Sequence, residues 1–237
     1  MTYKTSRARK QLQMVYKNIK KRIRKSENKK VDVDIREYVV SAAIFLAFAE
    51  IENYITDVFS DFSTCTAANV TKGSELPGNM RPHLFLQKSN ATATFGNFII
   101  SNSEKEMFRS LATAFNGHAR SYVDDSIQLQ AFTGKDIYTT IKYPSEKNLE
   151  KLFLRIGVDK IFDKLSALLG ENAKTSLQSI SSLRTQLAHT GALPGISSKD
   201  VRGRLDSAER FVGAIDRILY QITTSSYNAA QWNRYLC

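Results

Sequence analysis

Cysteine and histidine are scarce in this chain, and each scarcity excludes a class of site. The 237 residues include two cysteines, Cys65 and Cys237, which are too few for a disulfide framework and do not form a metal-binding pair. The three histidines stand far apart, at His83, His118 and His189, so no His/Cys cluster indicates a zinc centre. We therefore expect a reducing, cytoplasmic setting and a site that uses no metal and no cofactor.

Long hydrophobic runs are also missing. The longest covers residues 39–49 and contains one serine, whereas a membrane-spanning helix needs about 20 apolar residues. The first thirty residues are basic and contain no apolar stretch, so we expect no cleavable signal peptide. The run at residues 39–49 predicts a buried core helix, and we expect no membrane partner.

The formal net charge of +11 comes from one short segment. Residues 1–30 hold twelve Lys or Arg and one acid, Glu27, whereas the other 207 residues hold 22 basic and 22 acidic side chains. This distribution indicates a local basic arm on a protein that is otherwise electrically balanced.

The basic segment has the spacing of a helix. Apolar residues recur at steps of four, three and four along one helical face, at Leu12, Tyr16, Ile19 and Ile23. Two compatible interpretations remain open: a solvated helix that lays a narrow apolar stripe on the body, or a surface for phosphates. For the second, we predict these nucleic-acid-binding residues: Lys17, Lys20, Lys21, Arg22, Arg24 and Lys25.

Helical periodicity dominates the remaining sequence and predicts an all-α fold. Apolar residues surround the segment from Asp34 to about Phe62, which predicts a central helix. Further helices are expected at about 103–132, with a break near Gly117 left open, and at about 145–157, 159–170, 174–189 and 198–222. The residues of 174–189 expected to face inward are Leu177, Ile180, Leu183 and Leu187. In 198–222 apolar residues recur at steps of four and three, and Ser197 or Ser198 is expected to cap this helix, with Asp200 in its first turn. The tail after Thr223 is predicted to be irregular.

Residues 63–103 interrupt the helical pattern with glycines and prolines. Within them, residues 83–86 and 94–100 could form short strands or an extended loop, and residues 135–143 are expected to be extended. The predicted architecture is therefore an up-and-down helical bundle with a loop or short-hairpin insertion after the second helix. The predicted boundaries are 1–30 for the basic N-terminal arm or helix, 31–224 for the helical domain and 225–237 for the C-terminal tail.

Arg184 and His189 form the one Arg-x4-His pair of the chain. The segment Ser182-Leu183-Arg184-Thr185-Gln186-Leu187-Ala188-His189-Thr190-Gly191 resembles the signature of the HEPN superfamily, and residues 143–157 and 42–59 are similar to its RiboL-PSP-HEPN type. The resemblance covers roughly residues 34–62 and 140–224. It implies a helical bundle that dimerises so that the motifs of two protomers meet. Active members of the family are metal-independent endoribonucleases, many of which act in toxin–antitoxin or antiviral defence systems.

The two residue types suit this chemistry. Histidine exchanges protons near neutral pH, so His189 could serve as general acid or base for a ribose 2′-hydroxyl. Arginine keeps its charge and matches phosphate oxygens, so Arg184 could hold the phosphate. Such a reaction requires RNA and leaves a 2′,3′-cyclic phosphate and a 5′-hydroxyl. Glu52 is a further candidate, because the family tends to carry an acid on this helix. Thr185 is another candidate, although active members often have Asn, Asp or His after the arginine.

Alternatives to this hypothesis remain. On an ideal helix, positions five apart are separated by about 140°, so Arg184 and His189 share a site only if the helix end distorts or a second protomer completes it. His189 could instead satisfy carbonyls at a helix end, with Arg184 in a surface ion pair. We therefore expect a hydrolase of the HEPN ribonuclease type, or else a non-catalytic module on the same fold that binds nucleic acid or a partner. The expected partners are RNA, a second copy of the chain, and an antitoxin or other defence-system protein.

Overall fold

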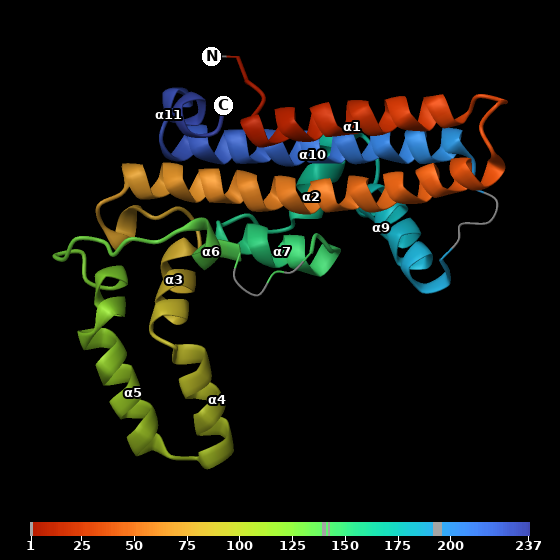
Figure 1. Cartoon of the computed structure of the whole chain (residues 1–237). Helices are drawn as coiled ribbons and strands as arrows, with labels where there is room; N and C mark the ends of the chain where they lie inside the picture. The colour runs from red at the N-terminus through yellow and green to blue at the C-terminus, as the bar shows by residue number, and fades with distance from the viewer. Residues whose placement is uncertain (1, 139–140, 142, 192–195) are drawn as a thin grey trace. The chain divides into compact units, whose positions relative to one another are not determined.

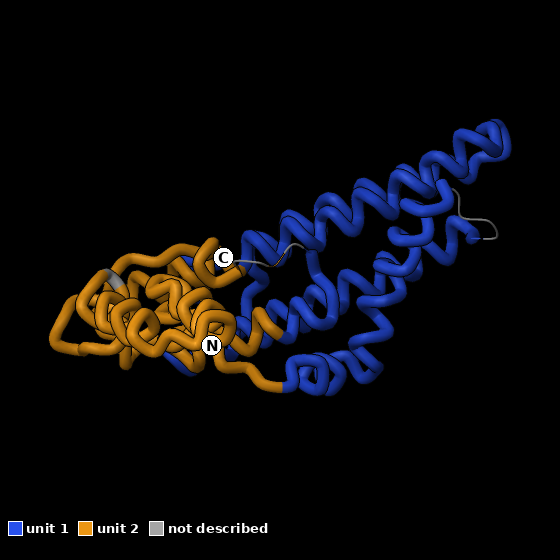
Figure 2. The backbone as a smooth tube through the Cα atoms, turned by 90° about the horizontal axis from the view of Figure 1, so that it is seen from below, with its two compact units in different colours: residues 1–58, 142–150, 160–237 blue, residues 59–141, 151–159 orange. Residues whose placement is uncertain are grey.

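The computed structural model describes residues 2–138, 141, 143–191 and 196–237. These residues form helices joined by turns and loops, with no strand among them (Figure 1). The all-α prediction is confirmed. The chain divides into two compact units, coloured separately in Figure 2: residues 1–58, 142–150 and 160–237 form unit 1, and residues 59–141 and 151–159 form unit 2.

Unit 1 is a helical bundle centred on its longest complete helix, α10. This helix contacts four others of the unit, and α1, α2 and α10 run side by side (Figure 1). Ser197 caps the start of α10 together with Asp200, as the sequence predicts. The elements of unit 1 are α1 (Arg7–Ser26), the first part of α2 (Val33–Asn69), α8 (Ile161–Leu169), α9 (Ala173–Thr190), α10 (Ser198–Ser226) and α11 (Ala229–Tyr235).

The basic helix α1 is part of the core of unit 1. Its apolar stripe of Leu12, Tyr16, Ile19 and Ile23 is at most 4% exposed, and the Tyr16 hydroxyl donates a hydrogen bond of 2.9 Å to the Ala47 carbonyl of α2. The packing agrees with the first of the two interpretations of this segment, and it leaves the charged face of the helix outside. Because the stripe supports the bundle, α1 is not a detachable arm.

A buried carboxylate fixes the beginning of α1. Asp216 of α10 is fully buried and accepts hydrogen bonds from the Tyr3 and Ser6 hydroxyls, from the Ser6 amide at 3.1 Å and from the Tyr54 hydroxyl at 3.2 Å. Arg9 donates in turn to the Tyr3 oxygen at 2.9 Å. These donors satisfy a charge whose burial would otherwise be costly. The cluster ties the N-terminal segment, α2 and α10 together.

Helix α2 is longer than the sequence predicts, since it continues past Phe62 to Asn69. By length and composition it could cross a membrane, a test that the core helix of a bundle also passes. Within unit 1 its buried face carries Ile44, Ala47 and Ile51, and its Tyr54 hydroxyl lies 3.4 Å from the Val212 carbonyl of α10. The helix therefore has the contacts of a bundle core along this face.

The prediction of strands or loop for residues 63–103 is wrong, because this part of unit 2 is helical. The sequence pattern misleads because the β-branched and aromatic residues of 94–100 pack as a helix against α5, and tertiary packing overrides their weak preference for strands. The elements of unit 2 are the last part of α2, η1 (Gly73–Glu75), α3 (Met80–Lys88), α4 (Ala91–Ser101), α5 (Glu104–Asn116), η2 (His118–Tyr122), α6 (Gly134–Tyr138) and the end of α7 (Glu146–Arg155).

Three further expectations need correction. The helix expected at 103–132 does break at Gly117, but only the short η2 follows the break in place of a helix that continues towards Phe132. Residues 135–138 of the segment expected to be extended lie in α6, while residues 139, 140 and 142 of that segment lie outside the described residues. The C-terminal tail contains α11, whose Trp232 is fully buried and donates a hydrogen bond of 2.9 Å to the Lys4 carbonyl. The tail is helical because this aromatic side chain docks on unit 1.

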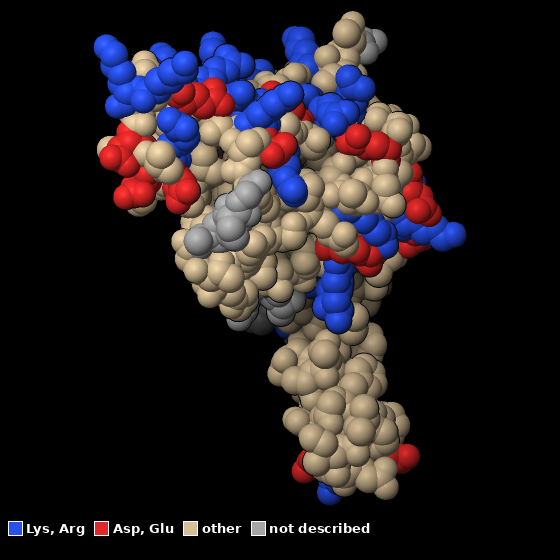
Figure 3. Space-filling view, turned by 90° about the vertical axis from the view of Figure 1, so that its right-hand side faces the viewer, with Lys and Arg blue, Asp and Glu red and all other residues tan. Residues whose placement is uncertain are grey.

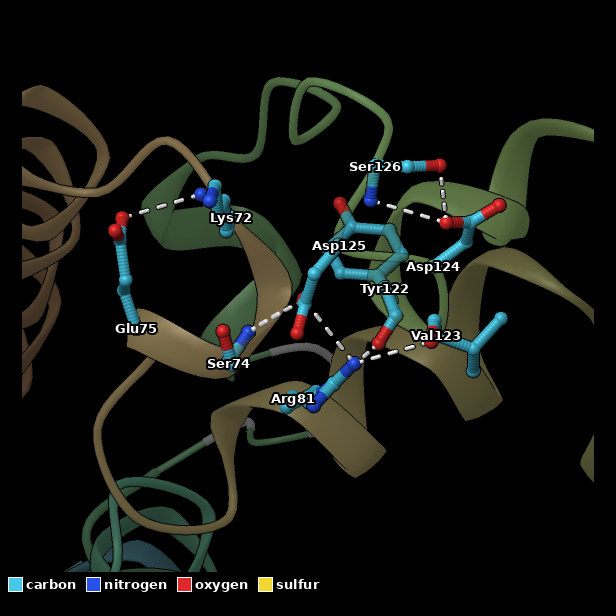
Figure 4. A network of polar contacts seen from close by, with 9 residues as sticks. All are labelled: Lys72, Ser74, Glu75, Arg81, Tyr122, Val123, Asp124, Asp125 and Ser126. Atoms are coloured by element: carbon cyan, nitrogen blue, oxygen red, sulfur yellow. Dashed lines mark hydrogen bonds and ion pairs between the residues drawn. The ribbon is translucent and has the colours of Figure 1, made fainter.

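A polar network around Arg81 joins η1, α3 and η2 in unit 2 (Figure 4). The Arg81 guanidinium donates to the Tyr122 carbonyl at 2.5 Å, to the Val123 carbonyl at 3.2 Å and to the Asp125 carboxylate at 3.3 Å. Asp125 also accepts from the Ser74 amide at 3.0 Å, and these hydrogen bonds lower the pKa of its carboxyl group. Since Arg81 satisfies backbone carbonyls, we interpret this network as structural.

Candidate active site

The Arg-x4-His segment lies on α9, which begins and ends as the sequence predicts. The Asn172 side chain accepts hydrogen bonds from two amides of the first turn, and Gly191 ends the helix with a φ of +69°, a conformation that favours glycine. The predicted inward residues are all buried: Leu177, Ile180, Leu183 and Leu187. This burial fixes the rotation of α9 and turns Arg184, Thr185 and His189 towards solvent.

Arg184 is held against α2 by an aromatic ring. Its guanidinium carbon lies 5.7 Å from the centre of the Phe48 ring, within the range of a cation–π interaction. Phe48 itself is only 5% exposed, so the ring is a fixed platform beneath an exposed cation. No sequence pattern distinguishes Phe48 from its neighbours, because it lies within an apolar run.

Glu52 lies one helical turn beyond Phe48 on α2 and is half-buried. Burial raises the pKa of its carboxyl group, and the positive charge of Arg184 opposes this by lowering it. The two predicted residues are therefore electrostatically coupled across the α2–α9 contact. Arg184, Phe48 and Glu52 form one group, which we call the arginine cluster.

His189 lies on the same helix as Arg184 but is not part of the arginine cluster. α9 is helical through both positions to Thr190, so a turn of 100° per residue separates the two side chains by about 140°, and the rise separates them by about 7.5 Å. The helix end is therefore not distorted in a way that would unite the pair. Thr185 and His189 are exposed, so both are open to a second molecule.

The face of α2 beside the arginine cluster is apolar and exposed. Its exposed side chains include Ile35 at 56%, Tyr38 at 75%, Phe45 at 41% and Leu46 at 49%. We call these four residues the α2 face. This face cannot be recognised from periodicity, because apolar residues surround the helix and no pattern distinguishes its buried side from its exposed side. Exposed apolar patches of this kind mark interaction surfaces.

The basic residues of α1 border a cleft of about 630 Å³ that Glu209 of α10 closes on one side. Five of the six predicted nucleic-acid-binding residues line this basic cleft: Lys17, Lys20, Lys21, Arg24 and Lys25. Arg22 lines the neighbouring groove between α1 and α2 instead. Lys and Arg side chains gather over this part of the surface (Figure 3).

Lys20 differs from the other residues of the basic cleft because carboxylates neutralise it. Its ammonium nitrogen lies 2.5 Å from Asp206 and 2.9 Å from Glu209. Burial alone would lower the pKa of Lys20, but these hydrogen bonds outweigh it and raise the pKa. We therefore expect Lys20 to support the wall of the cleft and its exposed neighbours to meet a ligand.

His83 and the possible metal ligands were the other candidates for a site elsewhere in the described ranges. His83 of unit 2 is half-buried, lies 2.8 Å from the Asp136 carbonyl through its Nε2 atom, and has a pKa lowered by burial. Among the residues that the structure describes, no three His, Cys, Asp or Glu side chains gather as metal ligands.

In a comparison with protein families, the chain matches the model described as RiboL-PSP-HEPN over residues 6–221. The match includes both α1 and the segment 63–103, which the sequence resemblance had left out. Neither the curated proteins nor the solved structures contain a match to this chain.

The coupling of Glu52 to Arg184 can be measured directly. Replacing Arg184 with Ala removes the positive charge that lowers the pKa of Glu52, so this pKa is expected to rise further above its usual value. Carbon-detected NMR titration of the glutamate side chains measures the shift. Arg202→Ala is the matched control, because Arg202 pairs with Glu27. An unchanged Glu52 pKa in Arg184→Ala would contradict the proximity of the two groups.

Proposed function

Because the chain belongs to the RiboL-PSP-HEPN family, we propose that it is a metal-independent endoribonuclease whose active site forms where two copies meet. The observation that carries the proposal is the arginine cluster, in which an exposed guanidinium is fixed on Phe48 beside an exposed apolar face. An arginine held in this way needs little further ordering when it meets a phosphate, which favours binding.

His189 and Arg184 divide the chemistry between them. In the proposed reaction His189 removes the proton of a ribose 2′-hydroxyl, and the resulting oxygen attacks the adjacent phosphorus. Arg184 stabilises the negative charge that develops on the phosphate oxygens. The bond to the 5′-oxygen breaks as that oxygen gains a proton, which leaves a 2′,3′-cyclic phosphate and a 5′-hydroxyl. Glu52 acts as a positioning residue, because its carboxylate attracts Arg184. Thr185 lies exposed beside Arg184 and can donate a hydrogen bond to the RNA.

In the proposed dimer, the second copy of the chain supplies a second α9 helix with its own Arg184 and His189. A two-fold contact through the α2 face would bury Tyr38, Phe45 and Leu46 against their equivalents, since the same apolar patch can serve both sides. This contact lies beside Phe48 and Glu52, so it would carry the motif residues of each copy towards the other. In the proposed site, Arg184 of one copy works with His189 of its partner.

The basic cleft would hold the RNA chain. Lys17, Lys21, Arg24 and Lys25 offer four positive charges along one helix, a spacing suited to successive phosphates. Contacts of this kind carry no sequence preference, so they would add affinity for any single-stranded RNA.

A cytoplasmic role in a toxin–antitoxin or antiviral defence system fits a ribonuclease of this family, with an antitoxin or other defence protein as a partner. The alternative is a non-catalytic module of the same fold that binds nucleic acid or a partner through the basic cleft and the α2 face. The two functions share every surface described above and differ in whether His189 performs chemistry.

Substitution of His189 separates the two functions. The wild-type protein is expected to cleave single-stranded RNA in the presence of EDTA, and His189→Ala is expected to lower the rate by at least about 100-fold, because it removes the general acid–base group. The affinity for RNA should change little, since the basic cleft is intact. Gel-resolved cleavage of labelled RNA and fluorescence anisotropy measure the two quantities.

The matched control is Gln186→Ala, which changes another exposed side chain of α9 and should cleave at the wild-type rate. An RNA that carries a 2′-deoxy sugar at the cut position should resist cleavage. A wild-type protein that binds RNA and cuts none, with or without metal, would establish the binding module in place of the nuclease.

The basic cleft predicts the salt dependence of RNA binding. In a His189→Ala background, Lys17→Ala with Lys21→Ala should weaken binding and flatten the plot of log affinity against log salt by up to about 1.4, because each phosphate contact contributes about 0.7. Lys147→Ala with Lys164→Ala removes the same charge from exposed positions outside the cleft. A slope that changes equally in both pairs would contradict a specific role for the cleft.

A further inference from the structure

Helices α4 and α5 of unit 2 form a helical hairpin whose outer surface is unusually apolar. The two helices contact each other, and only the short segment Asn102–Ser103 joins them (Figure 1). Phe98 on α4 and Met107 and Leu111 on α5 are half-buried, so we assign these residues to the inner side of the hairpin. Large apolar side chains nevertheless remain on the outside of both helices.

The exposed apolar residues are arranged in stripes with helical spacing. Phe95 and Ile99 lie one turn apart on α4, and Phe108 and Phe115 lie two turns apart on α5. On each helix, the exposed stripe is turned away from the inner residues by a similar angle about the helix axis, and in the same sense from N- to C-terminus. Because the two helices run antiparallel, these equal turns bring both stripes to the same side of the hairpin, where they form one surface. Phe85 of α3 extends it, with its ring centre 5.4 Å from that of Phe115.

The apolar area of this surface is that of a small interface. The exposed fractions of the side chains in the two stripes are 44% for Phe95, 81% for Ile99, 60% for Phe108 and 47% for Phe115. Large side chains of this kind each bury roughly 150–250 Å², so these four offer on the order of 450 Å² of apolar area per copy. Two copies together would remove about 900 Å², which is the size of a small, transient protein interface.

The charge of the hairpin favours a second copy as the occupant. Residues 89–103 contain no charged side chain, and the charges of 104–117 cancel, because Glu104 and Glu106 balance Lys105 and Arg109. The hairpin is thus neutral in a chain whose formal net charge is +11. In Figure 3 the part that carries α4 and α5 is uncharged along its length and bears charge at its tip. Two copies can meet here without the repulsion that their basic surfaces would cause.

We propose that the hairpin is a self-association surface, on which α4 and α5 of one copy pack against α4 and α5 of a second copy as a four-helix layer. The contact is two-fold, because an uncharged apolar patch is complementary to itself. It is separate from the α2 face, since it uses residues of unit 2 alone. The proposal does not depend on ribonuclease activity.

Light scattering coupled to size-exclusion chromatography tests this surface. Ile99→Glu with Phe108→Glu places four carboxylates in the two-fold contact and is expected to halve the number of copies in each particle. Asn97→Glu, an exposed change on α4 away from the stripe, should keep the wild-type mass. Equal masses for the wild type and the double variant would overturn the proposal. Binding of the wild type, but not the variant, to uncharged phosphatidylcholine vesicles without a mass difference would assign the surface to lipid instead.

A second measurement keeps the test valid if the double variant fails to fold. In the wild-type protein, amide hydrogen exchange in residues 91–116 should slow as protein concentration rises, because association protects these helices. Exchange that stays constant over a hundredfold range of concentration would overturn the proposal. Phe45→Glu, on the α2 face, should leave the concentration dependence of the hairpin intact, so the two contacts can be separated.

Discussion

The pitch of one α-helix governs the functional account of this protein. Buried leucines and an isoleucine fix the rotation of α9 on the bundle, and the helix continues through Arg184 and His189 to Thr190. At 100° per residue, the two side chains must leave the helix in different directions. A single α9 helix therefore does not direct both side chains at the same point. In the proposed ribonuclease, a second copy of the helix supplies the group that works with each of them.

The charge distribution supports the proposal that α1 holds the RNA while α9 carries the residues that cut it. The excess positive charge lies on α1, a helix that also contributes Leu12, Tyr16, Ile19 and Ile23 to the core. The helix that carries this basic face is consequently fixed in the bundle, and the carboxylates of Asp206 and Glu209 hold Lys20 in the wall of the cleft. Cations on a fixed helix lose less conformational entropy on binding a polyanion than cations on a flexible tail would.

Sequence periodicity predicted the parts of the fold that depend on local pattern. The spacing of Leu177, Ile180, Leu183 and Leu187 gave the buried side of α9, and the apolar steps of 201–222 gave the buried side of α10. The same reasoning failed for 63–103, where strand-preferring residues such as Thr94 and Ile99 form α4. Their helical state depends on contact with α5, which no local pattern contains.

The site was predictable only in part, for a similar reason. Residue types and spacing singled out Arg184, His189 and Glu52, but Phe48 and the α2 face lie in a helix that is apolar on all sides. Which of its faces is covered depends on where α1, α9 and α10 pack. The arrangement of two copies is even less predictable from local sequence patterns, because it depends on surfaces that only the folded chain presents.

Mixing two inactive variants tests whether Arg184 of one copy works with His189 of another. Arg184→Ala and His189→Ala should each be inactive alone. When they are unfolded together and refolded as an equimolar mixture, half of the dimers contain both chains, and each of these has one complete site out of two. RNA cleavage is therefore expected to return to about a quarter of the wild-type rate. A mixture that forms mixed dimers and stays inactive would contradict this pairing.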